Sequence, residues 1–355
     1  MVKTDICAPN NIKEDTCFPE EVIDELSKKL GTGNTIQEIR DETNCDNDLC
    51  VAGKTDKPTD FVEYFIPPKP ETWKKSHTPE DKKSNIWLST LDIDNVLNQY
   101  QDKYKDFKYF GAVPIDFDHK LITGENEVCV SDDLCKINMK ELWNDGYRNF
   151  GFVFNTDRHD QPGQHWISMF VSKNGIYFFD SVGTKPKNEI IKLMNTITDS
   201  LNECLCDSTI NPNELSDVHS VHKKLTKPAK KGTNKLFMDT EWLMKGGVLF
   251  LDDKPYKILE IRKDHVVVSP KLSKEYELGT TIVERCWRQF YNDKKHQYGN
   301  TECGIYSIYF IINMLEKGNE FLEILENVIV DDEIQENRDI FFRERNEKVD
   351  GGLKL

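Results

Sequence analysis

A glutamine and a cysteine lie six positions apart in the segment HQYGNTECGIYS, residues 296–307, at the start of an apolar run. The run from Cys303 to Gly318 predicts a buried helix with the cysteine in its first turn. Free N–H groups and the helix dipole at that place favour a thiolate and face developing negative charge. Gln297 offers a side-chain N–H donor nearby. The pair therefore predicts an acyl-transfer site, with Cys303 as nucleophile and Gln297 as oxyanion donor.

A base and an orienting acid occur on two earlier segments. His165 begins the run HWISMFVS, and Asp180 ends the run GIYFFD; both runs have the aromatic and β-branched composition of strands. Neighbouring strands joined by a turn place these two side chains together, so that the carboxylate fixes the imidazole tautomer and supports the imidazolium. Each residue alone also has a structural interpretation, because free cysteines are often buried as small hydrophobes. The conjunction of four residue types in this order favours the catalytic interpretation.

Several other polar residues have two interpretations. Asn155 and Asp157 could shape the same cleft, although capping of a turn is favoured. His296 beside the glutamine is a weaker candidate for a second base. His219 and His222 suit a metal only on a helix with further ligands, so a solvated position is favoured. We expect no metal site.

Two residues next to the catalytic candidates are expected to contact substrate. Gly304 follows the nucleophile directly and leaves room for a substrate backbone. Trp166 follows the predicted base and either covers the active-site cleft, where it confines the narrow end of the substrate, or fills the core.

These motifs carry a family resemblance. HW on a strand, FDS closing the next strand and Q-x5-CG opening a helix resemble the SUMO-specific protease family and its adenovirus-protease relatives. The similarity runs from WLSTLDI at Trp87 to about Met314. Within the family, YFGAVPIDFD, GFVFNTD and FFDSVG-x-x-P are most similar to the maturation proteases of large cytoplasmic DNA viruses. Glu302 departs from the aspartate that usually precedes the cysteine in this family and keeps its charge.

The resemblance implies an α+β fold of the papain-like or adenain-like type, with a central mixed sheet flanked by helices. We expect residues 1–84 to form an N-terminal extension, with a helix over 16–30 and a loop over 41–84, which is rich in Asp, Asn, Lys, Thr and Pro. We expect residues 85–355 to form the protease domain, with helices from residue 89 and over 187–206. The long stretch between Asp180 and Gln297 predicts a small β-rich insertion at about 225–285.

Composition limits the classes of partner. The formal net charge of −15 argues against non-specific nucleic-acid binding, and the basic run Lys223–Lys235 is interpreted as a solvated loop. No apolar stretch of membrane-spanning length or signal-peptide core occurs, which favours a cytosolic location. The ten dispersed cysteines predict free thiols. A structural zinc site is the alternative, on the pairs Cys45/Cys50, Cys129/Cys135 and Cys204/Cys206.

The resemblance implies a cysteine endopeptidase without a cofactor, which cleaves after small residues, of the Gly-Gly-X or Ala-Gly-X type. Virion core or capsid precursors are the implied substrates, and the virion or host cytoplasm the implied location. Whether nucleic acid activates the enzyme is left open. The terminal sequence Gly351-Gly352-Leu353 is a self-processing site, a substrate mimic or a coincidence. The alternative functions are a deSUMOylase or deubiquitinase, an effector-type acetyltransferase and a non-catalytic scaffold.

Overall fold

A central sheet positions the residues of the predicted active site. The computed structural model describes residues 6–11, 15–70, 87–124, 126–215, 220–317 and 321–350. Its five-stranded sheet has the order β1-β4-β5-β6-β13, in which the two outer pairs are parallel and the inner pairs are antiparallel. The strands are β1 (Phe107–Pro114), β4 (Asn149–Asn155), β5 (Trp166–Ser172), β6 (Gly175–Phe179) and β13 (Gln289–Tyr291). The predicted mixed sheet is confirmed.

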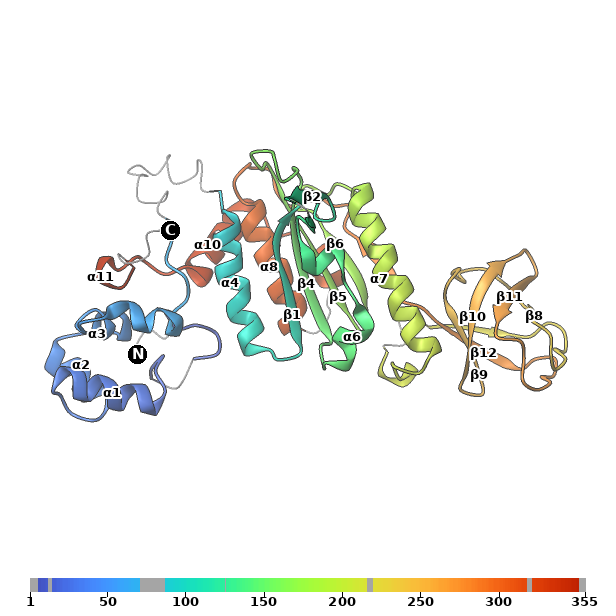
Figure 1. The fold of residues 1–355 in the computed structure, drawn as a ribbon, viewed down its shortest axis with the longest axis horizontal. Coiled ribbons are helices and arrows are strands. Elements are labelled where there is room, and N and C mark those ends of the chain that lie inside the picture. The colour runs from blue at the N-terminus through green and yellow to red at the C-terminus, as the bar shows by residue number, and fades with distance from the viewer. Residues whose placement is uncertain are drawn as a thin grey trace.

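Helices cover both faces of this sheet because its strands alternate buried side chains between two apolar cores (Figure 1). Phe152 and Phe154 face the core beneath α7, whereas Val153 faces the core beneath α8. The helices on the α8 side are α4 (Thr90–Lys103), α8 (Cys303–Glu316), α9 (Phe321–Glu326) and α10 (Asp331–Phe341). Those on the other side are α6 (Met139–Asn144) and α7 (Asn188–Cys206). No helix in the described part of the chain has the length and hydropathy to cross a membrane.

The main sequence-based helices are confirmed. The apolar run at residue 303 forms α8, which ends at Glu316; Gly318, the predicted stop, lies outside the described residues. The segments after residues 89 and 187 form α4 and α7. A short hairpin of β2 (Lys120–Thr123) and β3 (Asn126–Cys129), followed by α5 (Asp132–Cys135), joins β1 to α6.

A second sheet lies between α7 and β13 in the sequence and has its own apolar core (Figure 1). Its order is β7-β12-β9-β10-β11-β8, and the backbone N–H of Thr226 donates to the carbonyl of Phe237 at 2.8 Å, which links the two edges. A β-rich segment was predicted here, and the first strand begins at Ser220. The strands are β7 (Ser220–Lys224), β8 (Lys235–Phe237), β9 (Val248–Leu251), β10 (Lys254–Ile261), β11 (His265–Ser269) and β12 (Thr281–Arg285).

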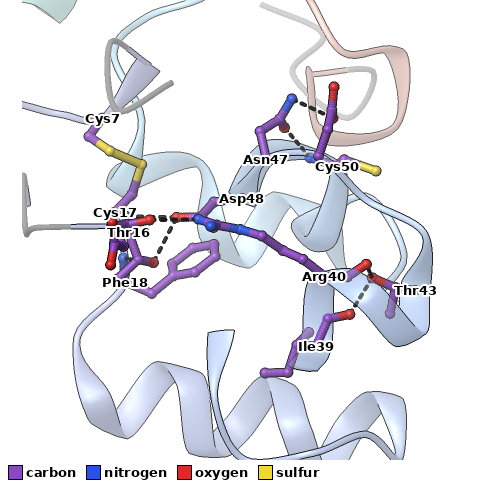
Figure 2. A network of polar contacts seen from close by, with 12 residues as sticks. Cys7, Thr16, Cys17, Phe18, Ile39, Arg40, Thr43, Asn47, Asp48 and Cys50 are labelled. Atoms are coloured by element: carbon purple, nitrogen blue, oxygen red, sulfur yellow. Dashed lines mark hydrogen bonds and ion pairs between the residues drawn. A yellow bond between two sulfur atoms is a disulfide. The ribbon is translucent and has the colours of Figure 1, made fainter. Parts of the chain in front are cut away.

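The N-terminal segment is more ordered than its composition predicts. It contains α1 (Glu20–Leu30), α2 (Ile36–Thr43), α3 (Asp48–Ala52) and a 3-10 helix, η2 (Pro58–Tyr64), so the predicted loop from residue 41 is wrong up to residue 64. Figure 2 shows the reason: the buried Asp48 carboxylate accepts hydrogen bonds from Arg40 Nε at 3.0 Å and Thr16 Oγ1 at 2.7 Å. Polar side chains that suggested a loop instead bond to one another. Residues 71–84 of the predicted loop lie outside the described part.

The prediction of free thiols is wrong for six of the ten cysteines. Disulfides join Cys7 to Cys17, Cys45 to Cys50 and Cys129 to Cys135, with Cα–Cα separations of 5.1, 5.5 and 6.2 Å that suit a bridge. Two of the pairs considered for zinc are therefore disulfides. The free thiols are Cys204, Cys206, Cys286 and Cys303. Within the described ranges, no group of three or more His, Cys, Asp or Glu side chains is arranged to hold a metal.

The C-terminal segment after α10 contacts the N-terminal segment. Arg343 N donates to the carbonyl of Pro67 at 3.0 Å, and its guanidinium forms a buried ion pair with Asp350 in α11 (Glu347–Asp350), Nη2 to Oδ1 at 2.7 Å. Val349 packs in the apolar core of the N-terminal segment. The residues 351–355, including the Gly-Gly-Leu sequence, lie outside the described part.

Candidate active site

The pairing of β5 with β6 brings His165 and Asp180 together. His165 directly precedes β5 and Asp180 directly follows β6, and the antiparallel register aligns Ser168 with Phe179. The resulting contact joins His165 Nε2 and Asp180 Oδ1 at 2.7 Å. The carboxylate is buried and the imidazole is 21% exposed, so the pair lies at the edge of the protein interior.

The cysteine completes a chain of three side chains. Cys303 is the first residue of α8 and lies close enough to His165 to influence the pKa of its imidazole. Burial lowers the pKa of His165, but the hydrogen bonds and charges of Asp180 and Cys303 outweigh this effect and raise the pKa to about 9. With Nε2 held by the carboxylate, Nδ1 is the nitrogen left for the sulfur. The arrangement therefore favours a protonated imidazole beside the thiol.

The amide of Gln297 lies in the loop that leads into the nucleophile. Ser181 Oγ donates to Gln297 Oε1 at 2.6 Å, and Gln297 N donates to the Ser181 carbonyl at 2.8 Å. These bonds turn the amide nitrogen towards the start of α8, where Nε2 lies 3.4 Å from Glu302 Oε2. Only 2% of the residue is exposed. Its donation to an oxyanion stays a prediction.

Trp166 and Gly304 both contact Leu88. The indole Nε1 of Trp166 donates to the Leu88 carbonyl at 2.9 Å, and a Cβ on Gly304 would lie 2.9 Å from Leu88 Cβ. The missing side chain of Gly304 therefore makes room for Leu88, whereas we expected it to make room for a substrate backbone. A contact of Gly304 with substrate stays a prediction.

A cavity of about 540 Å³ borders the Leu88–Trp166 contact. Its walls come from the residues before α4, the ends of β1 and β4, and the loop before β5. Of the wall residues, Trp166 directly follows His165 in the sequence, and Leu88 packs against Gly304, the residue after Cys303. The lining is Trp87, Leu88, Ser89, Thr90, Val113, Pro114, Val130, Asn155, Arg158, His159, Gln161, Pro162, Gly163 and Trp166.

The turn interpretation of Asn155 is confirmed. Its Oδ1 accepts from the backbone N–H of Asp157 at 3.0 Å and of Gln164 at 3.3 Å, while the residue also lines the cavity. Asp157 Oδ2 in turn accepts from Gly163 N at 3.2 Å. The loop before His165 is thus built by side-chain bonds that shape the cavity wall.

The remaining histidine candidates lie apart from this chemistry. The His296 ring is buried against Phe179 and Tyr306, and burial lowers its pKa, followed by a smaller effect of the Lys294 charge. Its Nε2 has no hydrogen-bond partner among the residues that the structure describes, which does not suit a second base. His222 is exposed on β7, and His219 lies outside the described residues.

Sequence reasoning missed the residues that support the site. Asn292 holds the backbone of Asp180 in both directions: Asp180 N donates to Asn292 Oδ1 at 2.8 Å, and Asn292 Nδ2 donates to the Asp180 carbonyl at 2.7 Å. Ser181 holds Gln297. The FDS motif contained Ser181 as a signal, but no local pattern marks Asn292, because its partner is 112 positions away.

Comparisons with known proteins found similar sequences and one similar fold. No protein-family model matches the chain. A protein of Acanthamoeba polyphaga mimivirus, named as a thiol protease, is 27% identical over 268 residues, which are 75% of this chain and 60% of that protein. The cysteine protease of African swine fever virus is 24% identical over 210 residues, which are 55% of this chain and 71% of the viral protein. This chain thus spans less than two thirds of the mimivirus protein.

The crystal structure of the African swine fever virus protease shares the fold. It superimposes with a TM-score of 0.53 at 17% identity and covers 96% of both chains. In sequence the chain is therefore similar to a thiol protease of mimivirus and to the cysteine protease of African swine fever virus, and it shares the fold of the African swine fever virus protein.

Proposed function

We propose that this protein is a cysteine endopeptidase that cleaves precursor proteins after small residues, at sites of the Gly-Gly-X or Ala-Gly-X type. The observation that carries the proposal is the contact of Asp180 with His165, whose pKa is also raised by Cys303 at the start of α8. A buried carboxylate, an imidazole with a raised pKa and a thiol at a helix N-terminus are the groups that acyl transfer needs.

In the proposed mechanism, the Cys303 thiolate attacks the carbonyl carbon of the scissile peptide bond. The oxyanion forms near the backbone N–H of Cys303, which has no partner within the helix, and near the Gln297 amide. The imidazolium of His165 then gives its proton to the leaving amine as the C–N bond breaks. Neutral His165 next takes a proton from water, whose oxygen attacks the thioester and releases the acid and the thiolate. No cofactor takes part in these steps.

The predicted preference for small residues has support in the surroundings of Cys303. Trp166, which follows His165, bonds to Leu88, and Leu88 packs against Gly304, which follows Cys303. We propose that these side chains leave little room for side chains next to the scissile bond. The cavity beyond them offers a place for residues farther from that bond. Because the similar proteins are viral, we propose virion core or capsid precursors as substrates, and the virion or host cytoplasm as the place of action.

We propose a division of the chain into an N-terminal extension, residues 1–84, and a protease domain, residues 85–355, with a β insertion at about 225–285. The separate apolar clusters of the N-terminal helices and of the second sheet support this division.

A quenched peptide with Gly-Gly before an apolar residue tests the proposed activity. We expect Cys303→Ala and His165→Ala to abolish cleavage. Cys206→Ala is the matched control, because Cys206 is a free thiol on α7 and burial raises its pKa to about 11. Full activity of Cys303→Ala would refute the proposal.

Cleavage of a ubiquitin-like conjugate is the second candidate function. Some similar African swine fever virus proteins carry the name SUMO-1 cysteine protease. A higher kcat/KM on a SUMO conjugate than on the Gly-Gly peptide would favour this function over precursor processing.

A further inference from the structure

The loop between β13 and α8 carries Gln297 and ends at Cys303, so its shape decides where both oxyanion donors point. Its backbone is held from outside. Tyr298 N and Gly299 N donate to one oxygen of Asp331, Oδ2, at 2.8 and 2.6 Å. The other oxygen of Asp331 accepts from the Tyr306 hydroxyl on α8 at 3.2 Å. One carboxylate therefore joins the loop to the helix that begins with the nucleophile.

Asp331 begins α10, and two further residues of that helix reach the same loop. Gln335 Nε2 donates to Glu302 Oε1 at 2.6 Å, and Arg338 Nη2 donates to the Thr301 carbonyl at 3.0 Å. Asp331, Gln335 and Arg338 follow one another at intervals of four and three positions, which places them on one face of the helix. Arg338 Nε also donates to Gln335 Oε1, so the residues of this face support one another.

Glu302 is the point where these contacts meet. Its buried carboxylate accepts from Thr301 N at 2.9 Å and Thr301 Oγ1 at 2.6 Å, and lies 3.4 Å from Gln297 Nε2. A buried carboxylate needs such partners, because loss of one leaves its charge poorly compensated. Burial lowers the pKa of Arg338 to about 10, against the opposing charges of Glu302 and Cys303, so the guanidinium remains charged at neutral pH.

We infer that Asp331, Gln335 and Arg338 are positioning residues of the proposed acyl-transfer site. They hold residues 298–302 so that the Gln297 amide and the Cys303 backbone N–H face the same oxyanion. The inference rests on the proposed function, because an oxyanion forms only if acyl transfer takes place. It assigns to α10 a part in catalysis although none of these three residues touches the substrate.

The expected effect of losing a contact is on the rate of acyl transfer. Oxyanion donors act only when they are accurately placed, and displacement of reacting groups by about 1 Å can cost about 100-fold in rate. We expect Gln335→Ala and Asp331→Ala to lower kcat by about 10- to 100-fold, with KM within about twofold. Asp331→Asn retains one acceptor oxygen and should recover part of the lost kcat.

Alkylation of Cys303 by iodoacetamide separates positioning from damage to the nucleophile. Alkylation needs the thiolate but forms no oxyanion, so its rate should stay within about twofold of wild type in Gln335→Ala and Asp331→Asn while kcat falls. Glu336→Ala is the control, because Glu336 is exposed next to Gln335 on the same helix. It should leave both rates unchanged.

Three outcomes would overturn the inference. Unchanged kcat in Gln335→Ala and Asp331→Asn, with an active wild type, would refute it and leave the proposed function intact. Parallel losses of peptide cleavage, alkylation and thermal stability would indicate a structural role alone. A wild type inactive on peptide and conjugate, with no effect of Cys303→Ala, would refute the proposed function and the inference together.

Discussion

Replacement of Asp180 by asparagine removes the negative charge that faces His165 Nε2 at 2.7 Å while it preserves the size of the side chain. Burial lowers the pKa of His165, and the contacts with Asp180 and Cys303 raise it overall from 6.5 to about 9. This rise corresponds to about 3 kcal/mol in favour of the imidazolium, shared between the two partners. Asp180→Asn should therefore lower the pKa of His165 by about one pH unit or more.

The pH dependence of kcat/KM reports this change. The mechanism needs protonated His165, so kcat/KM of the wild type should stay level through neutral pH and fall about tenfold per pH unit above pH 9. In Asp180→Asn this alkaline fall should begin at a lower pH. Because the folded-state pKa is raised, the pair also stabilises the fold fully below pH 6.5, and this contribution is lost as pH rises through about 9.

The assay is peptide cleavage from about pH 6 to about pH 10, with Asp118→Asn as the control, since Asp118 pairs with Lys192 on the surface. The control should keep the wild-type profile. If Asp180→Asn retains the same alkaline limb as the wild type, the carboxylate does not set the pKa of His165 and the reasoning fails.

Three further predictions concern packing and buried charge. Burial lowers the pKa of His296, so as pH falls below 6.5 the unfolded state gains a proton first and the fold loses stability. His296→Phe should remove this loss, measured as the difference in the free energy of urea unfolding between about pH 5 and about pH 7.5. The same difference in wild type and variant would contradict the prediction. Asp350→Ala leaves the buried charge of Arg343 without its carboxylate and should lower the free energy of unfolding by about 3 to 5 kcal/mol. A loss below about 1 kcal/mol would show that the ion pair is dispensable. Gly304→Ala places a Cβ against Leu88 and should lower the free energy of unfolding by about 1 to 3 kcal/mol. In the double variant, Leu88→Ala should recover part of this loss. If the losses of the two single variants simply add, the clash is excluded.

The sequence identified the catalytic candidates because their elements have strong local patterns. The aromatic and β-branched runs around His165 and Asp180 form β5 and β6, and the apolar run after Cys303 forms α8. Strands and buried helices of this kind are encoded by residues close together in the chain. The placement of His165 beside Asp180 followed from one turn between adjacent strands.

Local patterns were misleading where polar side chains serve long-range contacts. The Asp-, Asn- and Thr-rich stretch after residue 41 was interpreted as a loop, yet Arg40 and Asp48 are buried together, and Asp48 is bonded to Thr16. The cysteines that composition left as thiols are paired in three disulfides, because chain folding brings their Cα atoms within bridging distance.

By itself, then, the sequence determined the α+β class, the strands and helix that carry the catalytic candidates, and their order along the chain. Only the tertiary structure decided what holds them: Asn292 against Asp180, Leu88 against Gly304, and the polar face of α10 against the loop before Cys303. Periodicity reports which face of an element is buried, whereas a hydrogen bond depends on the positions of both partners. Those positions are set when separate elements pack together, so no local window of the chain contains them.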